Sequence, residues 1–450
     1  MKTKLGSYIK ILQGYAFKTE NYVEKSNYRL VTLGNFQEGG NCFKYNDDKA
    51  TYYGADFPQK VILQEGDLIL PLTEQVVGLF GNSAFIPHEE RFKFVLNQRV
   101  GKIVLKNDDI DKYYLHYLLA TKEVKKQLEA RASGTKQRNI SPDDVYDVSV
   151  ELPDIYTQIR TGNLLHKIEQ KQMNNNQINS ELESLAKTLY DYWFLQFEFP
   201  NEEGKPYKSS GGKMVYNEQL KKEIPEGWEV LKVKDLLNVI TGKQDSNFAT
   251  INGAYKFFTC SSEVLNCDEY AFEGKAVLLA GNGDFNVKHY QGKFNAYQRT
   301  YVLIPKEEKY FGAIYLATEK LVKKFKAGSN GSIVKFITKG DVENIEILKP
   351  QNDNLLEQFN LILKFIEKNK EENEELTKLR DFLLPLLMNG QVTIQDAEAQ
   401  VKNTISNVWN AEKLLRFAQW KQMQGYAARG EVDEETLMKI FDAMDKDAKK

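Results

Sequence analysis

The sequence contains little cysteine, no long apolar run and no excess of one charge. Three cysteines in 450 residues, scattered along the chain, are too few for a disulfide framework or a four-ligand zinc site, which favours a reducing compartment. No apolar stretch approaches the roughly 20 residues that a membrane helix needs. Residues 1–10 lack the apolar core of a signal peptide. We therefore expect a cytoplasmic protein without a membrane segment.

The charges are balanced. Lysine and arginine number 61 and aspartate and glutamate number 63, so the formal net charge is −2. This balance excludes a strongly basic nucleic-acid-binding protein and a strongly acidic tail protein, but it leaves local basic surfaces open. The length predicts roughly three domains.

Motifs for enzyme chemistry are missing. The sequence contains neither a Gly-x4-Gly-Lys-[Ser/Thr] phosphate loop nor the Asn/Asp-Pro-Pro-aromatic tetrapeptide of amino-methyltransferases. The four histidines show no metal-ligand spacing. We therefore predict no catalytic residue, no metal site and no cofactor in this chain.

An internal repeat organises what is present. Residues 114–153 align with residues 311–350 at a constant offset of 197, without a gap. The shared pattern is Gly-[Thr/Ser]-x-x-[Arg/Lys]-x-Ile-[Ser/Thr]-x-x-Asp-Val, and we call it the glycine motif. A looser match relates Gln98-Arg99 to Gln298-Arg299. A period of this length indicates two copies of one domain-sized unit.

Each copy predicts the same order of elements. Short strand-like runs bounded by Gly and Asn turns come first. A helix follows, at 113–130 in copy one and at 311–326 in copy two, and then the glycine motif and a strand that ends in proline.

A long helix is expected after each copy. Its apolar residues alternate in steps of four and three, which is a heptad seam. The two seams contain Leu164, Ile168, Asn175, Ile178, Leu182 and Leu185, and Leu355, Phe359, Ile362, Ile366, Leu376 and Leu383. Polar residues interrupt both seams near the middle, which favours pairing of the two helices over packing of each helix on its own copy.

Binding chemistry gathers at the glycine motif and near it. Hydroxyl, amide and cationic side chains around a glycine turn suit phosphate oxygens and base edges, and a solvated turn is the alternative. The candidates are Ser133, Thr135, Lys136, Gln137 and Arg138 in copy one, and Asn330, Ser332 and Lys335 in copy two. Lysines precede both motifs, at Lys125 and Lys126 and at Lys323 and Lys324. A second candidate loop contains Asn282, Asn286, Lys288, Gln298 and Arg299.

The order of copy, long helix, copy, long helix resembles the DNA specificity (S) subunit of type I restriction-modification enzymes. Three segments are similar to that family's central and distal regions: Leu189-Tyr-Asp-Tyr-Trp-Phe-Leu-Gln-Phe with Gly204–Met214, Ile224-Pro-Glu-Gly-Trp228, and Leu379-Arg-Asp-Phe-Leu-Leu-Pro-Leu-Leu-Met-Asn-Gly390. The resemblance covers roughly residues 1–390.

The resemblance implies an α+β fold with two α/β target-recognition domains, separated by an antiparallel two-helix coiled coil and related as a pseudo-twofold internal repeat. The implied parts are recognition domains at 1–153 and 226–350, coiled-coil helices at 154–199 and 351–390, a linker at 200–225 and a helical extension of unknown role at 391–450.

The resemblance also implies the function. Each domain would read one half of a bipartite, asymmetric site in double-stranded DNA. Two methyltransferase subunits and ATP-dependent endonuclease/translocase subunits would bind this chain and carry the chemistry, with S-adenosylmethionine, ATP and Mg²⁺ as their cofactors. A change at Arg138 should then weaken one half-site and a change at Lys335 the other. The rival hypotheses are a coiled-coil scaffold that does not read DNA and an enzyme with unrecognised motifs.

Overall fold

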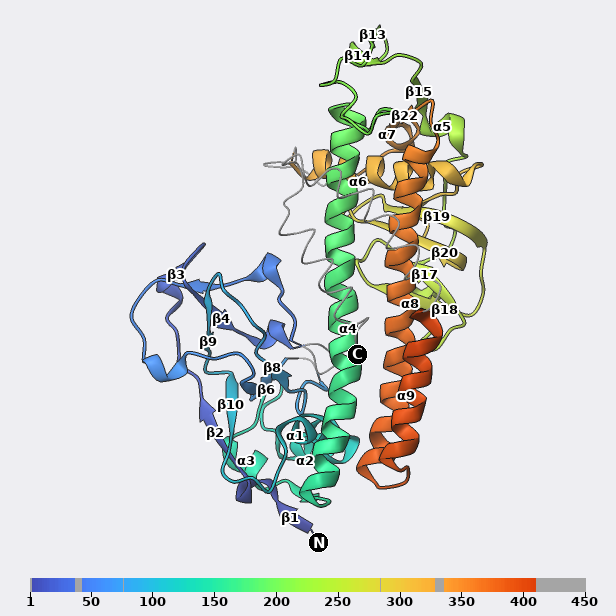
Figure 1. Ribbon diagram of the computed structural model, residues 1–450. Coiled ribbons are helices and arrows are strands. Elements are labelled where there is room, and N and C mark those ends of the chain that lie inside the picture. The colour runs from blue at the N-terminus through green and yellow to red at the C-terminus, as the bar shows by residue number, and fades with distance from the viewer. Residues whose placement is uncertain (1, 37–42, 76, 284, 328–335, 410–450) are drawn as a thin grey trace. The chain divides into compact units, whose positions relative to one another are not determined.

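The computed structural model describes residues 2–36, 43–75, 77–283, 285–327 and 336–409. The chain divides into two compact units, and each contains one copy of the repeat and part of both long helices (Figure 1). The described part of unit 1 lies within 2–173 and 374–409, and the described part of unit 2 lies within 174–373. None of the described helices is long and apolar enough to cross a membrane.

The two long helices are α4 (Ile155–Tyr190) and α8 (Asn354–Met388). α4 begins beside Asp154, whose carboxylate accepts bonds from the backbone N–H and the hydroxyl of Thr157 at 3.0 and 2.6 Å. These bonds satisfy a first-turn donor that has no partner inside the helix. A π-helical turn, Asp191–Leu195, follows α4. A further helix, α9 (Ile394–Trp409), follows α8.

The long helices run antiparallel and contact each other through polar side chains. In unit 2, Asn175 Nδ2 donates to Glu372 Oε2 at 2.8 Å. Further along α4, Asn179 Nδ2 donates to the carbonyl of Ile366 at 3.3 Å. Rising residue numbers on one helix therefore meet falling numbers on the other. The helices pair, as the polar interruptions favour, and they run antiparallel, as the resemblance implies.

Most of the heptad-seam residues are buried, and Leu182 is partly buried. The buried ones are Leu164, Ile168, Asn175, Ile178, Leu185, Leu355, Phe359, Ile362, Ile366, Leu376 and Leu383. In unit 1, residues of α4 and α8 form one apolar cluster with Ala397 and Val401 of α9. Arg160 on α4 also pairs with Glu398 on α9 at 3.0 Å. The first part of the predicted extension is thus a third helix packed on the pair.

The sheets of unit 1 are antiparallel except where β4 meets β9. The central sheet has the order β2-β10-β6-β8, a second sheet has the order β3-β5-β4-β9, and the pairs β1-β12 and β11-β7 complete the unit. The strands are β1 Lys2–Lys4, β2 Ile9–Gln13, β3 Tyr22–Val23, β4 Tyr28–Val31, β5 Tyr52–Tyr53, β6 Leu68–Pro71, β7 Thr73–Glu74, β8 Ala84–Phe85, β9 Lys93–Leu96, β10 Val100–Leu105, β11 Arg138–Asn139 and β12 Ser149–Glu151. The short helices are α1 Lys112–Leu119, α2 Lys122–Arg131 and α3 Pro142–Tyr146.

Unit 2 contains one six-stranded sheet in the order β16-β21-β19-β20-β17-β18, together with the pairs β13-β14 and β15-β22. The strands are β13 Met214–Asn217, β14 Lys222–Pro225, β15 Glu229–Lys232, β16 Ile240–Thr241, β17 Tyr255–Phe258, β18 Val264–Cys267, β19 Phe272–Ala280, β20 Val287–Ala296, β21 Thr300–Leu303 and β22 Glu346–Lys349. The helices are α5 Val233–Leu236, α6 Phe311–Ala327 and α7 Lys339–Glu343. The hairpin β13-β14 occupies part of the predicted linker at 200–225.

The two units share one architecture. Strands β2-β10-β6-β8 of unit 1 correspond to β16-β21-β19-β20 of unit 2 in the same order. The capping box Ser141–Asp144 opens α3, and Thr338–Asp341 opens α7 at the offset of 197. In both boxes the aspartate N–H donates to the hydroxyl at 3.2 Å. The repeat is therefore structural as well as sequential.

One predicted helix differs. The helix expected at 113–130 is two helices, α1 and α2, because the chain turns at Ala120 and Thr121. The Thr121 hydroxyl accepts a bond from the N–H of Val124 at 3.4 Å and so opens α2 as an N-cap. The equivalent threonine, Thr318, instead bonds back to the carbonyl of Ile314 at 2.7 Å and remains inside the continuous helix α6.

A buried charged cluster joins α1 to α4 within unit 1. The Glu169 carboxylate accepts a bond from the Tyr117 hydroxyl at 2.5 Å and lies 3.5 Å from His116 Nε2 and 3.6 Å from His166 Nδ1. Burial raises the pKa of Glu169, but the bonds from the two imidazoles and the phenol outweigh burial and hold that pKa below its ordinary value. The Ser83 hydroxyl contacts His116 Nδ1 at 2.8 Å and completes the cluster.

Candidate nucleic-acid interface

In unit 2 the structure brings the second candidate loop next to the end of the glycine motif. The N–H of Gly281 donates to the carbonyl of Arg299 at 2.9 Å, and its carbonyl accepts the N–H of Ile337 at 2.9 Å. Ile337 belongs to the glycine motif of copy two, so Gly281 and Ile337, which are 56 residues apart in the sequence, meet at one surface. Asn330, Ser332 and Lys335 lie outside the described residues.

Polar side chains hold this loop in shape. Lys288 Nζ donates to the carbonyl of Ser261 at 2.6 Å and to Asn286 Oδ1 at 2.5 Å. Asn286 Nδ2 donates to the carbonyl of Cys260 at 2.8 Å. Burial lowers the pKa of Lys288 to about 8, and the nearby Cys260 thiol partly opposes that shift.

The remaining candidates in unit 2 differ in exposure. Gln298 is exposed, and its Nε2 donates to Asp245 Oδ1 at 2.8 Å. Arg299 is exposed as well, whereas Asn282 is half-buried. Exposed cationic and amide groups at the end of the sheet are able to reach a phosphate or a base edge.

In unit 1 the glycine motif forms a small hairpin. Ser133 and Asn139 exchange backbone bonds at 3.0 and 2.8 Å around Gly134, which has a φ of +104°. A residue with a side chain rarely adopts that conformation, so the turn requires glycine. Thr135 and Lys136 are exposed at its tip. Gln137 is half-buried, and its Nε2 donates to Asn139 Oδ1 at 3.4 Å.

Arg138 has a structural partner that the sequence did not indicate. Its Nη1 lies 3.2 Å from Glu74 Oε1, and its Nη2 donates to the carbonyl of Glu129 at 3.0 Å. The Glu74 side chain is 1% exposed, and it also accepts the N–H groups of Leu79 and Phe80 at 3.0 and 3.2 Å. Arg138 therefore neutralises a buried carboxylate, and a DNA contact would be an additional role.

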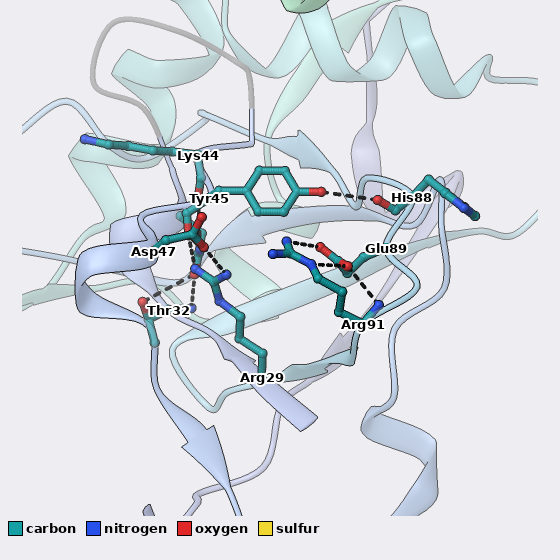
Figure 2. A network of polar contacts seen from close by, with 9 residues as sticks. Arg29, Thr32, Lys44, Tyr45, Asp47, His88, Glu89 and Arg91 are labelled. Carbon is teal, nitrogen blue, oxygen red and sulfur yellow. Dashed lines mark hydrogen bonds and ion pairs between the residues drawn. The ribbon is translucent and has the colours of Figure 1, made fainter. Parts of the chain in front are cut away.

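A polar network ties two loops of unit 1 together beside β4 and β9 (Figure 2). The buried Arg29 pairs with Asp47 at 2.5 Å and donates to the carbonyl of Tyr45. Its guanidinium also lies 5.3 Å from the ring centre of Phe92, within cation–π range. The Tyr45 hydroxyl donates to the carbonyl of His88 at 3.2 Å and so joins the two loops.

The exposed side of this network carries both signs of charge. Arg91 donates to both carboxylate oxygens of Glu89 at 2.9 and 2.7 Å, which raises the pKa of Arg91 and lowers that of Glu89. Hydrogen bonds that His88 donates to Glu65 and then to Glu90 raise the pKa of this exposed imidazole. Because carboxylates neutralise these cations, the network shapes the loops more than it offers free positive charge.

Two grooves occupy equivalent places in the two copies. The groove in unit 1 has a volume of about 770 Å³ and lies among α2, β12 and the end of α8. The groove in unit 2 has a volume of about 760 Å³ and lies among α6, β22 and the end of α4. The offset of 197 relates Val124 to Leu321 and Leu384 to Lys187 in their linings. Each groove is thus closed by the long helix that follows the other copy.

Lysines line much of the groove in unit 2. Lys323 and Lys324, the candidates that precede the glycine motif, are exposed there. Lys222 is also part of the lining, and burial and then the charge of Lys320 lower its pKa. Lys187 also lines this groove, but its charge is neutralised because it pairs with Glu319 at 3.0 Å.

Comparisons with known proteins agree with this architecture. The family model described as "Type I restriction modification DNA specificity domain" matches residues 1–184 and 225–379. The Type I restriction enzyme EcoDI specificity subunit of Escherichia coli is 36% identical over 185 residues, which cover 38% of this chain and 40% of that protein. This chain thus spans less than half of the E. coli protein in that match.

Two further proteins match over longer stretches. The Type I restriction enzyme MjaIX specificity subunit of Methanocaldococcus jannaschii is 26% identical over 329 residues, which cover 67% of this chain and 73% of that protein. The crystal structure of the Type-I restriction-modification system S subunit from M. genitalium matches 86% of this chain and 95% of its own, with a TM-score of 0.53 and 16% identity, which shows a shared fold. Because the family model matches more than half of the chain, and in both copies of the repeat, this chain belongs to the family of type I restriction-modification DNA specificity domains.

Proposed function

We propose that this chain is the specificity subunit of a type I restriction-modification complex and reads a bipartite, asymmetric DNA site. Loop clusters of different composition in the two units carry the proposal. Exposed polar and cationic groups lie at Thr135 and Lys136 on the glycine motif of unit 1, and at Gln298 and Arg299 beside the glycine motif of unit 2. Two different readers on one chain suit a site whose halves differ, just as identical readers of a dimer suit a palindrome.

The paired helices would set the distance between the half-sites. α4 and α8 are single helices of 36 and 35 residues, which contact each other along a seam that is apolar at its ends and polar in the middle. A paired helix is stiffer than a loop of the same length. The unread spacer in the DNA would then have one fixed length.

Partner subunits would supply the chemistry. We propose two methyltransferase subunits that use S-adenosylmethionine and flip a target adenine out of the duplex, and endonuclease/translocase subunits that use ATP and Mg²⁺. The two equivalent grooves support a methyltransferase stoichiometry of two, because a repeated surface binds a repeated partner. In this arrangement the chain works in the cytoplasm and is not itself an enzyme.

Methylation mapping tests the proposal. Genomic DNA from cells that express this chain with its methyltransferase should carry modified adenines in one two-part motif. Cells that express the methyltransferase alone are the control and should lack that motif. Assembly without sequence-specific methylation would instead support a coiled-coil scaffold that does not read DNA, and methylation or cleavage by the purified chain alone would support an enzyme.

A further inference from the structure

An asparagine occupies the equivalent position in both units. In unit 1, Ala84 of β8 pairs with Ile69 of β6, and Asn82 stands two residues before Ala84. In unit 2, Lys288 of β20 pairs with Leu278 of β19, and Asn286 stands two residues before Lys288.

The strands that carry these pairs are themselves equivalent. Ile69 lies opposite Lys102 of β10, and Leu278 lies opposite Val302 of β21. Lys102 and Val302 are both the third residue of the strand that directly follows the Gln-Arg pair of their copy. The residue before each asparagine also has a positive φ, +84° at Gly81 and +40° at Phe285.

A lysine ammonium contacts each asparagine, but the two lysines come from different elements. In unit 1, Lys125 of α2 reaches Asn82 Oδ1. In unit 2, Lys288 of β20 reaches Asn286 Oδ1 at 2.5 Å. The offset of 197 places Lys125 on Val322, so the repeat of the sequence does not relate the two lysines. Both units therefore have an ammonium group at the equivalent asparagine, although the two lysines come from elements that do not correspond.

Both ammonium groups are half-buried without a carboxylate beside them. Among the described residues, neither Nζ lies within 4 Å of a carboxylate oxygen, and the oxygens to which both ammonium groups donate are neutral amide or carbonyl oxygens. A partly desolvated cation without a carboxylate nearby is stabilised when it binds an anion. Glu129 and Glu74 act on Lys125 from a distance, and the titratable thiol of Cys260 faces Lys288. Asp284 lies outside the described residues.

We propose that Lys125 and Lys288 are equivalent receptors for a DNA phosphate, one in each recognition unit. This inference rests on the proposed function and adds a defined ligand atom, a phosphate oxygen, and a defined partner on each unit. Each phosphate would supply the charge that the asparagine oxygen lacks, and the asparagine would hold the ammonium at the same place in both half-sites.

The geometry also predicts a proton linkage. Burial lowers the pKa of both lysines, and that of Lys288 is about 8. A bound phosphate favours the charged ammonium and raises its pKa. Below about pH 8 Lys288 is already charged, so DNA binding takes up no proton there. Above that pH, binding must take up a proton, and affinity therefore falls as the pH rises.

The test uses the complex of this chain with its methyltransferase and a duplex that contains the mapped site. Dissociation constants are measured from neutral pH to about pH 9.5 and at several salt concentrations. The variants are Lys125→Met and Lys288→Met. Their controls are Lys10→Met on β2 and Lys293→Met on β20, both exposed. Thermal unfolding midpoints show which variants fold like the wild type.

Each of the two variants should reduce the slope of log affinity against log salt by about 0.9, the value for one phosphate contact, and should weaken binding about tenfold. Lys288→Met should also lose the fall in affinity above about pH 8. Lys288→Arg keeps a charge that does not titrate in this range, so it should retain the salt slope and lose the pH dependence.

Each outcome has a defined meaning. If folded Lys125→Met and Lys288→Met match their controls in salt slope, the phosphate receptors are refuted while the proposed function stands. If Lys288→Arg keeps the pH dependence, another group carries the linkage, and that part of the inference fails. If the wild-type complex binds no duplex selectively and methylates no motif, the proposed function itself is wrong.

Discussion

Asn176 and Asn373 hold the same position in the two copies of the repeat, and they bond to each other. Asn373 Nδ2 donates to Asn176 Oδ1 at 2.9 Å, and the offset between the two residues is the 197 of the repeat. The neighbouring pair, Asn175 and Glu372, obeys the same relation. Equivalent positions that contact each other are the mark of a local twofold relation between the paired helices, as in a symmetric dimer interface.

The polar layer of the helix pair should show coupling energy. Asn369 Nδ2 donates to Asn179 Oδ1 at 2.7 Å, and both side chains are buried. Asn369→Ala should lower the free energy of unfolding by about 1–3 kcal/mol, because it leaves a buried amide without this partner. Asn179→Ala together with Asn369→Ala should cost less than the sum of the single changes. Urea unfolding of the four proteins measures the cycle, and additive effects would contradict the coupling.

The buried cluster around Glu169 should make unit 1 sensitive to acid. The pKa of Glu169 is lowered in the folded state, so its stabilising effect is present above the ordinary value of 4.5 and is lost as the pH falls below it. Glu169→Gln should destabilise the protein by about 3 kcal/mol at neutral pH and flatten its acid dependence. Thermal unfolding from neutral to acidic pH measures both, with the exposed Glu151→Gln as control. Equal acid dependence in the two variants would argue against this role.

Arg138 should matter for folding as well as for binding. Arg138→Met leaves the buried Glu74 carboxylate without its counterion and should cost about 3 kcal/mol of stability. Adding Glu74→Gln should restore part of that loss. Lys136→Met, at the exposed tip of the same hairpin, should leave unfolding unchanged and reduce only DNA affinity. Unfolding midpoints distinguish the two; a fully stable Arg138→Met would mean that the ion pair contributes nothing.

The length of the helix pair should set the length of the DNA spacer between the two half-sites. Inserting one heptad into α4 and one into α8 at the central polar layer adds about 10.5 Å of helix and keeps the seam in phase. The spacer of the methylated motif should then grow by about three base pairs while both half-sites stay unchanged. A single extra residue in α4 alone is the control, since it rotates the seam out of phase. Altered half-sites with an unchanged spacer would contradict the prediction that the helix pair sets the spacer length.

The sequence by itself determined the elements that depend on local and periodic patterns. The heptad seams predicted α4 and α8, and the offset of 197 predicted two units of the same architecture. These features are readable because helix periodicity and caps such as Ser141–Asp144 depend on residues a few positions apart. The break between α1 and α2 was missed because the same Ala-Thr pair caps a helix in one copy and lies inside a helix in the other.

Only the tertiary structure decided which distant groups meet. Arg138 looked like a free cation until the fold brought the buried Glu74 to it, 64 residues back along the chain. Lys125 and Lys288 share no place in the sequence repeat, yet each reaches an equivalent asparagine. A side chain's partner is set by where separate strands and helices pack, and burial then fixes the cost of leaving its charge unpaired. A pattern along the chain records neither.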